Sequence, residues 1–64
     1  MVSIMTVKNG KLFHREVTDN WFNVYLSRAR FENLPLHWLS ENSYRITIKG
    51  QDFTVTSDRA IDNR

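Results

Sequence analysis

The sequence predicts a small α+β domain with the element order ββαββ, in which two antiparallel hairpins flank one central helix. Asn9-Gly10 and Gly50-Gln51 are hairpin-turn dipeptides between segments rich in β-forming residues. A single segment between them, residues 18–33, has helical periodicity. The chain has 64 residues, which is room for one domain, 1–64. We therefore expect the helix to pack across one face of an antiparallel sheet.

The first hairpin is predicted over residues 2–17. A two-residue type I′ turn would place Lys8 directly opposite Lys11. Because like charges that face each other are unfavourable, a three-residue loop with Gly10 in the left-handed region is the alternative. In the first register both faces of the hairpin are partly apolar, so we expect this sheet to be covered on both sides.

The helix is predicted from Thr18 to Asn33. Thr18 is a suitable N-cap, Asn33 a suitable left-handed C-cap, and Pro35 restricts the residue before it and prevents continuation. At about 100° per residue, one arc of the helix collects apolar side chains. These are Trp21, Phe22, Tyr25, Leu26 and Ala29. We expect all of them except Trp21 to be buried against the sheet.

The segment after the helix is predicted to connect it to the second hairpin. Residues 36–39 are expected to form one helical turn and residues 40–43 a loop. The polar tail, 58–64, is expected to fray.

The second hairpin is predicted over residues 44–57 with a type II′ turn at Gly50-Gln51. This register sets Lys49 opposite Asp52 and Ile46 opposite Val55. Its apolar residues share one face and its polar residues share the other.

The composition is that of a folded globular domain, with 41% hydrophobic and 25% charged residues. The chain has no cysteine, which excludes disulfides and thiolate zinc sites. Dense packing of the eight aromatic residues or self-association must then supply the stability. No apolar run approaches the ~20 residues of a membrane span, and no signal-peptide core is present, so we expect a cytoplasmic protein.

Motifs for catalysis or metal binding are missing from the sequence. His14 and His37 are the only histidines, and neither has a metal-ligand spacing around it. Both glycines belong to hairpin turns rather than to phosphate-binding loops. We expect no enzyme activity, no metal, no cofactor and no small-molecule substrate.

The first candidate site is a protein-binding patch on the helix side. Val24 and Phe31 are seven residues apart, on one stripe away from the core arc. If Trp38 and Leu39 cover this stripe, it is core. If they do not, Val24, Phe31 and Trp38 form an exposed apolar patch with Arg28 at its rim. The predicted partner is another protein or a second copy of the chain.

The alternative candidate is a DNA- or RNA-binding surface on the second hairpin. A basic, threonine-rich ribbon of this kind fits the major groove of DNA. Its residues are Arg45, Thr47, Lys49, Thr54 and Thr56, joined by Lys8 and Lys11 if both hairpin tips point the same way. The net charge of +2 is compatible with nucleic acid without requiring it.

In size and element order the chain is similar to small cysteine-free accessory proteins of bacteria and their viruses, which bind a host protein or DNA. The resemblance implies a regulatory interaction module.

Overall fold

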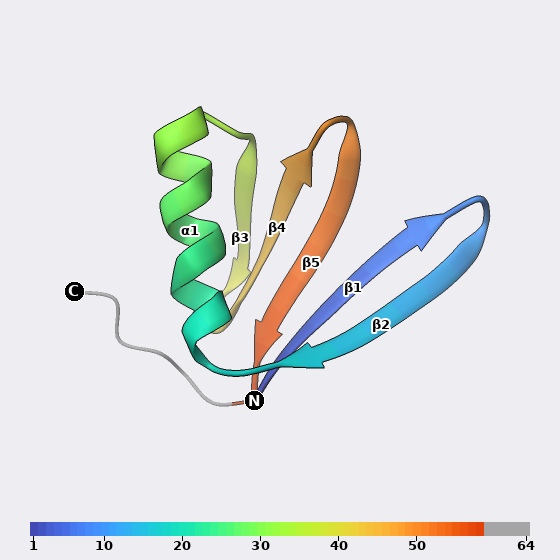
Figure 1. The fold of residues 1–64 in the computed structure, drawn as a ribbon, viewed down its shortest axis with the longest axis horizontal. Coiled ribbons are helices and arrows are strands. Elements are labelled where there is room, and N and C mark those ends of the chain that lie inside the picture. Colours follow the sequence, from blue (N-terminus) through green and yellow to red (C-terminus); the bar gives the residue numbers. More distant parts are fainter. Residues whose placement is uncertain (59–64) are drawn as a thin grey trace.

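The computed structural model describes residues 1–58 and confirms a small α+β fold in which strands precede and follow one helix (Figure 1). Five antiparallel strands form a single sheet. The elements are β1 Val2–Lys8, β2 Lys11–Val17, α1 Asn20–Glu32, β3 Leu36–Ser40, β4 Ser43–Ile48 and β5 Gln51–Ser57. Except for Asp58, the predicted frayed tail lies outside the described residues.

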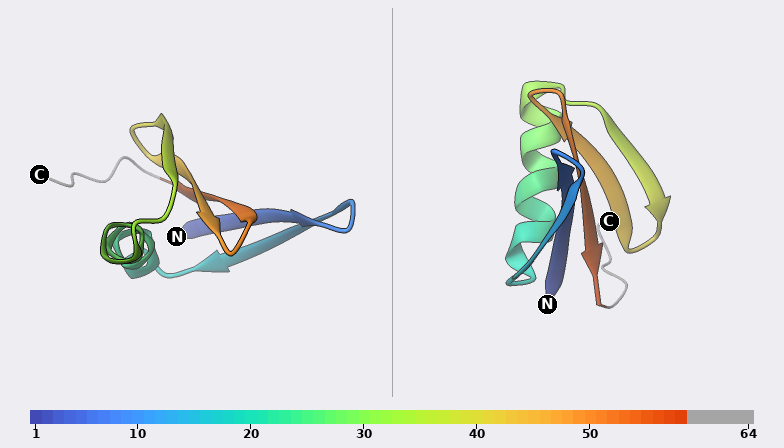
Figure 2. Two further views of the ribbon diagram at one scale, coloured as in Figure 1. Left: turned by 90° about the horizontal axis from the view of Figure 1, so that it is seen from above. Right: turned by 90° about the vertical axis from the view of Figure 1, so that its right-hand side faces the viewer.

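The strand order in the sheet is β2-β1-β5-β4-β3. The N-terminal hairpin is joined to the last strand by the β1–β5 pairing, so the first and last strands are neighbours within the sheet. Helix α1 carries the chain from one edge strand, β2, to the other, β3. Figure 2 shows α1 lying on one face of the twisted sheet.

The first hairpin has the predicted two-residue turn. Asn9 and Gly10 have φ values of 55° and 76°, which are the two positive values that a type I′ turn requires. Lys8 pairs with Lys11, and the register then continues without interruption to the Val2–Val17 pair. The three-residue alternative is therefore excluded.

The predicted register of the second hairpin is wrong. The turn is Lys49-Gly50, with φ values of 52° and 77°, so Ile46 faces Phe53 rather than Val55. Type I′ and type II′ turns both suit the right-handed twist of the strands, and the structure has the type I′ turn although Lys49 must adopt a left-handed backbone. Moving the turn by one residue moves each partner by two, so the predicted apolar face is preserved.

Residues 36–39 do not form the predicted helical turn. They belong to β3, which pairs with β4 so that Trp38 lies opposite Tyr44. A short apolar run is compatible with helix or strand, and here the free edge of β4 decides between them. The predicted loop at 40–43 is a tight turn in which Ser40 pairs with Ser43.

Helix α1 begins one or two residues later than predicted. Thr18 is not the N-cap: its carbonyl accepts a hydrogen bond from the Trp21 N–H at 3.1 Å, and the N-cap position is Asp19, whose side chain makes no capping bond. The Asp19 carboxylate instead lies 2.9 Å from the amino group of Met1. At the other end Asn33 is the predicted left-handed C-cap, with φ 54°.

The core lies between α1 and the sheet face that it covers. Its buried members are Val2, Ile4, Phe22, Ala29, Tyr44, Ile46 and Val55. Phe22 and Ala29 are buried as predicted, whereas Tyr25 and Leu26 are only partly buried. The Tyr44 ring lies 4.9 Å from that of Phe22 and 5.3 Å from that of Trp38, so an aromatic cluster joins α1, β4 and β3.

Contrary to expectation, nothing within residues 1–58 covers the second face of the sheet (Figure 2). We call it the open face. The β1–β5 ladder ends at the Thr6–Phe53 pair, and the first hairpin continues past it as a two-stranded ribbon (Figure 1). We call this ribbon, residues 7–12, the arm. A single helix about 10 Å wide cannot cover five strands spaced about 4.8 Å apart.

Candidate protein-binding surface

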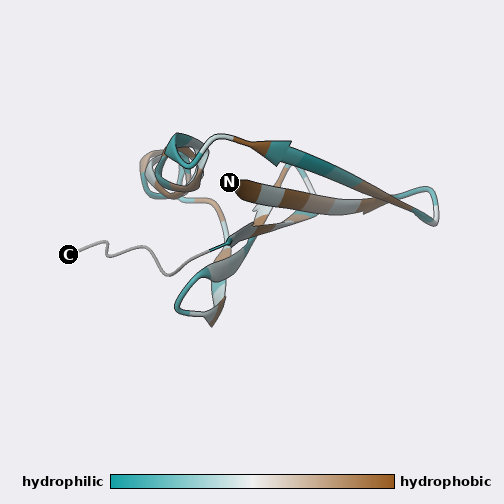
Figure 3. Cartoon of the chain, turned by 90° about the horizontal axis from the view of Figure 1, so that it is seen from below, coloured by the Kyte–Doolittle hydropathy of each residue, from teal (hydrophilic) through white to brown (hydrophobic). Residues whose placement is uncertain are grey.

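The arm and the start of β2 expose apolar side chains on both faces. Val7 and Leu12 form a cross-strand pair on the open face and are 62% and 67% exposed. Phe13 lies on the other face and is 51% exposed. Figure 3 shows hydrophobic positions along β1 into the arm. Exposed apolar side chains grouped in this way are typical of interaction surfaces.

Strand β2 has a free edge. All seven of its residues pair with β1, and β2 ends the strand order on that side. Because the turn has two residues, Lys8 and Lys11 form the hydrogen-bonded pair beside it, and the bonding direction then alternates along the strand. The N–H and C=O groups of Leu12, His14 and Glu16 therefore point away from β1.

The opposite edge, β3, is shorter and less regular than β2. It has five residues, its register is irregular between Trp38 and Ser40, and Pro35 immediately precedes it. Short length, a bulge and a proline are devices that block pairing at a sheet edge. Strand β2 has a regular register and contains neither proline nor glycine, and its protection is limited to the charges of Lys11, Arg15 and Glu16. It is therefore the more accessible edge.

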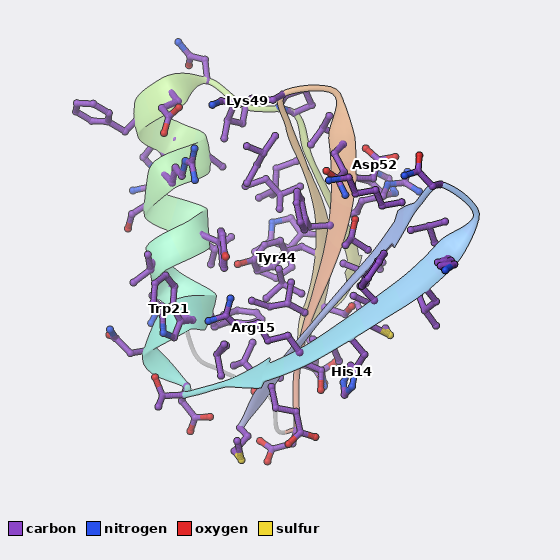
Figure 4. The ribbon with its side chains drawn as sticks, turned by 45° about the vertical axis from the view of Figure 1, so that its right-hand side comes forward. His14, Arg15, Trp21, Tyr44, Lys49 and Asp52 are labelled. Carbon is purple, nitrogen blue, oxygen red and sulfur yellow. The ribbon has the colours of Figure 1, made fainter. Side chains whose placement is uncertain are left out.

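A groove of about 390 Å³ lies between the first hairpin and α1. Phe13, Arg15, Tyr25 and Phe53 are among the residues that line it. Figure 4 shows Arg15 extending from β2 toward the helix, while His14 points away from it. The groove combines aromatic surface with one guanidinium directly beside the free edge of β2.

The predicted helix patch is divided by the structure. Phe31 is 90% exposed, and Val24 shares its side of α1, opposite Phe22. The Arg28 Nε is hydrogen-bonded to Glu32 at 2.7 Å on the exposed surface. Val24 and Phe31 are therefore an outward-facing pair.

Trp38 does not join that pair. Its ring lies 6.2 Å from that of Phe22, on the core side of the helix, where Trp38 also helps to line a second groove between α1 and β3. Trp38 thus neither covers the outward pair nor extends it. The position follows from β3, whose alternation places Trp38 on the same face as Tyr44.

The nucleic-acid candidates do not share one surface. Arg45, Thr47, Thr54 and Thr56 lie on the open face, with Thr56 at the end of β5 away from the turns, whereas Lys8 and Lys11 alternate to the helix side. Strands β1 and β4 are each antiparallel to β5, so the turns that follow them point the same way. A hollow of about 650 Å³ between the hairpins is lined in part by Lys8, Arg45 and Thr54. Lys49 lies in the turn of the second hairpin (Figure 4), and Lys11 directly follows the turn of the first.

Two of the candidate threonines are already engaged within the protein. Thr47 donates a 2.6 Å hydrogen bond to the Asp52 carboxylate, and the hydroxyls of Thr56 and Ser43 are 2.9 Å apart. Asp52 also lines the hollow and brings a negative charge into it. The ribbon is therefore less basic than its Lys and Arg residues alone indicate.

The histidines occupy opposite edges of the sheet, His14 on β2 and His37 on β3. In the described part of the chain no three His, Asp or Glu side chains are placed to hold a metal ion. The described residues also include no helix with the length and apolar character needed to cross a membrane.

Sequence reasoning missed Leu12 and Phe13. The available signal was the apolar character of both faces of the first hairpin, which we attributed to coverage on both sides. Comparison of the chain with protein-family models, with curated proteins and with solved structures finds no match.

Proposed function

We propose that the chain is a non-enzymatic protein-interaction module that binds an extended segment of a partner along the free edge of β2. The observation that carries the proposal is the regular, proline-free edge of seven residues beside the exposed side chains of Leu12 and Phe13. In strand addition, main-chain hydrogen bonds supply affinity and alternate side chains supply specificity.

The side chains around this edge suit such a ligand. Complete burial of a Leu or Phe side chain stabilises a complex by about 1.5–3 kcal/mol, before the costs of association. Phe13 and Arg15 lie on the face that borders the groove, so they would contact the partner's side chains on that face. Leu12 would contact those on the open face.

The outward pair on α1 supports a second protein-contact surface. Val24 and Phe31 are about 10 Å apart along the helix, at 1.5 Å per residue, with Arg28 on the flank of the same exposed side. Unlike the β2 edge, this surface offers no backbone hydrogen-bonding groups. It is the competing location for the same function.

Affinity capture from a lysate of the encoding organism tests the proposal and separates the two surfaces. The immobilised wild type is compared with Leu12→Ser, with Phe31→Ser and with Leu39→Ser, an equally small change at an exposed leucine on the other edge. We expect a protein that is retained by wild type, Phe31→Ser and Leu39→Ser and lost with Leu12→Ser. Loss with Phe31→Ser alone would move the site to α1, and no specific retention by the wild type would reject the proposal.

Nucleic-acid binding is the second candidate, favoured by the shared direction of the two hairpin tips. Four cations, Lys8, Lys11, Arg45 and Lys49, stand at that end. If each neutralises one phosphate, affinity for duplex DNA should fall about 10²-fold between 50 and 200 mM salt. Arg45→Ala should lower the salt slope by about one, while Arg30→Ala, on the helix, should not. No binding at 50 mM salt would eliminate this candidate.

A further inference from the structure

We infer that the extended segment bound at β2 is β2 of a second copy of the chain, paired antiparallel about a twofold axis at His14. This inference rests on the proposed function and names its partner. Its grounds are the accessible edge of β2 and the self-complementary order of charged and apolar side chains along that strand. A twofold interface requires such self-complementarity, because the same strand must serve as both partners.

The outward-pointing backbone groups set the first requirement. Leu12, His14 and Glu16 are the residues whose N–H and C=O groups are free for a new strand. With His14 opposite its own copy, Leu12 of each strand lies opposite Glu16 of the other. All three residues on each strand then pair, giving about six main-chain hydrogen bonds.

The side chains on the helix side fit this register. Each Phe13 then lies opposite the Arg15 of the other copy, an arrangement that allows a cation–π contact. Each Lys11 lies opposite a Val17, so no two lysines or arginines face each other. On the open face each His14 has a Glu16 of the other copy as its diagonal neighbour.

The neighbouring registers lack this fit. A slip of one step toward the turn places Lys11 opposite the Arg15 of the other copy twice, and a slip the other way places the two Arg15 residues opposite each other. Like charges directly opposite are unfavourable in a sheet, and each slip also leaves one outward residue of each strand without a partner. Electrostatics and hydrogen bonding thus select the same register.

The resulting dimer has one continuous sheet with twice the five strands of a single copy. Residues opposite each other in neighbouring strands point to the same face, so both helices lie on one side of that sheet. The grooves that contain Phe13 and Arg15 meet at the twofold axis. The pairing also covers the more accessible edge of the monomer, in a register that keeps its lysine and arginine side chains from facing each other.

Sedimentation equilibrium from micromolar to millimolar concentration tests the inference with charge variants at the axis. We expect a wild-type monomer–dimer equilibrium whose Kd rises about fivefold in both His14→Lys and His14→Glu, because each variant opposes two like charges. Mixing the two variants should restore association as a heterodimer. His37→Lys, the same change on the other edge strand, should leave the Kd unchanged.

The possible outcomes separate this inference from the proposed function. The inference is overturned if the wild type stays monomeric at millimolar concentration. It is also overturned if the Kd of the dimer is the same in both His14 variants as in the wild type. Failure of the mixture to associate better than either variant overturns the register and with it the inference. A monomer that still retains a partner through Leu12 overturns the dimer but leaves the proposed function intact. A monomer that retains no partner rejects both the dimer and the proposed function.

Discussion

Tyr44 links the helix to the sheet through one buried hydroxyl group. Its side chain is fully buried, and its Oη donates a 2.6 Å hydrogen bond to the Phe22 carbonyl. Burial, assisted by the nearby Tyr25, raises the pKa of Tyr44 above its ordinary value of 10.0. The neutral phenol is therefore favoured by folding, and its contribution to stability is complete below about pH 10 and is lost as pH rises through the folded-state pKa.

Replacing Tyr44 with Phe should lower the free energy of unfolding by about 1–2 kcal/mol at pH 7. The variant keeps the ring but leaves the buried Phe22 carbonyl without this donor. Above pH 10 the difference between wild type and variant should shrink. Urea unfolding at pH 7 and pH 11 measures both effects, and a constant difference across that range would contradict the assignment.

Truncation of Phe22 should lower the free energy of unfolding strongly, and truncation of Phe31 should barely change it. Phe22 has no exposed surface, so Phe22→Ala should cost about 3–5 kcal/mol, which is close to the whole stability expected for a domain of this size. Phe31→Ser should stay within about 0.5 kcal/mol of wild type. Circular dichroism at 25 °C distinguishes an unfolded Phe22→Ala from a folded Phe31→Ser, and a strongly destabilised Phe31→Ser would contradict the described surface.

At the scale of elements, the two long hairpins have the same turn geometry with different residues. The first uses Asn9-Gly10, which tolerates positive φ, and the second uses Lys49-Gly50, where Lys49 has φ 52°. A left-handed backbone costs an ordinary side chain about 1–2 kcal/mol, and asparagine adopts it more readily. The Lys49-Gly50 turn is therefore less stable than the same turn would be with asparagine at position 49.

Lys49→Asn should stabilise the protein by about 0.5–1 kcal/mol. Lys8→Asn makes the same chemical change one residue before the first turn, at a strand position, and should give no gain. Urea titrations of both variants compare the two positions. An equal effect in both would mean that charge, rather than backbone conformation, controls the change.

Much of the element level could be predicted from local signals. The first hairpin follows from its Asn-Gly dipeptide, and the end of α1 follows from Asn33. The prediction of the second turn was wrong because Gly50 fits the second central position of a type I′ turn as well as the first of a type II′ turn, and no local signal separates the two. The prediction for β3 was wrong because the segment from Leu36 to Leu39 has no periodicity of its own and becomes a strand only beside β4.

At the scale of the whole molecule, the sequence predicted one helix on an antiparallel sheet but not the order of its strands. That order depends on long-range pairing between β1 and β5, for which no local pattern exists. The strand order determines which strands lie at the edges of the sheet. It makes β2 an edge strand with free backbone groups, which the helix stripe of Val24 and Phe31 does not have. The predicted patch relied on helical periodicity alone and for that reason could not place Trp38.

The same arrangement divides the molecule into a packed body and a lightly supported arm. Tyr44 and Ile46 are buried at the centre of the body, whereas Lys8 and Lys11 pair only with each other at the end of the arm. Local opening of the arm exposes little apolar surface that was buried, so it costs less free energy than unfolding of the body.

Amide hydrogen exchange should therefore be at least about 10²-fold more protected at Tyr44 and Ile46 than at Lys8 and Lys11. The two-residue turns make all four residues members of hydrogen-bonded pairs, so the comparison is between bonded amides. Exchange read by NMR at two protein concentrations tests this. Lowering the concentration should reduce protection within β2 if a second copy pairs there, and should leave Tyr44 and Ile46 unchanged. Equal protection at all four amides would mean that arm and body open as one cooperative unit.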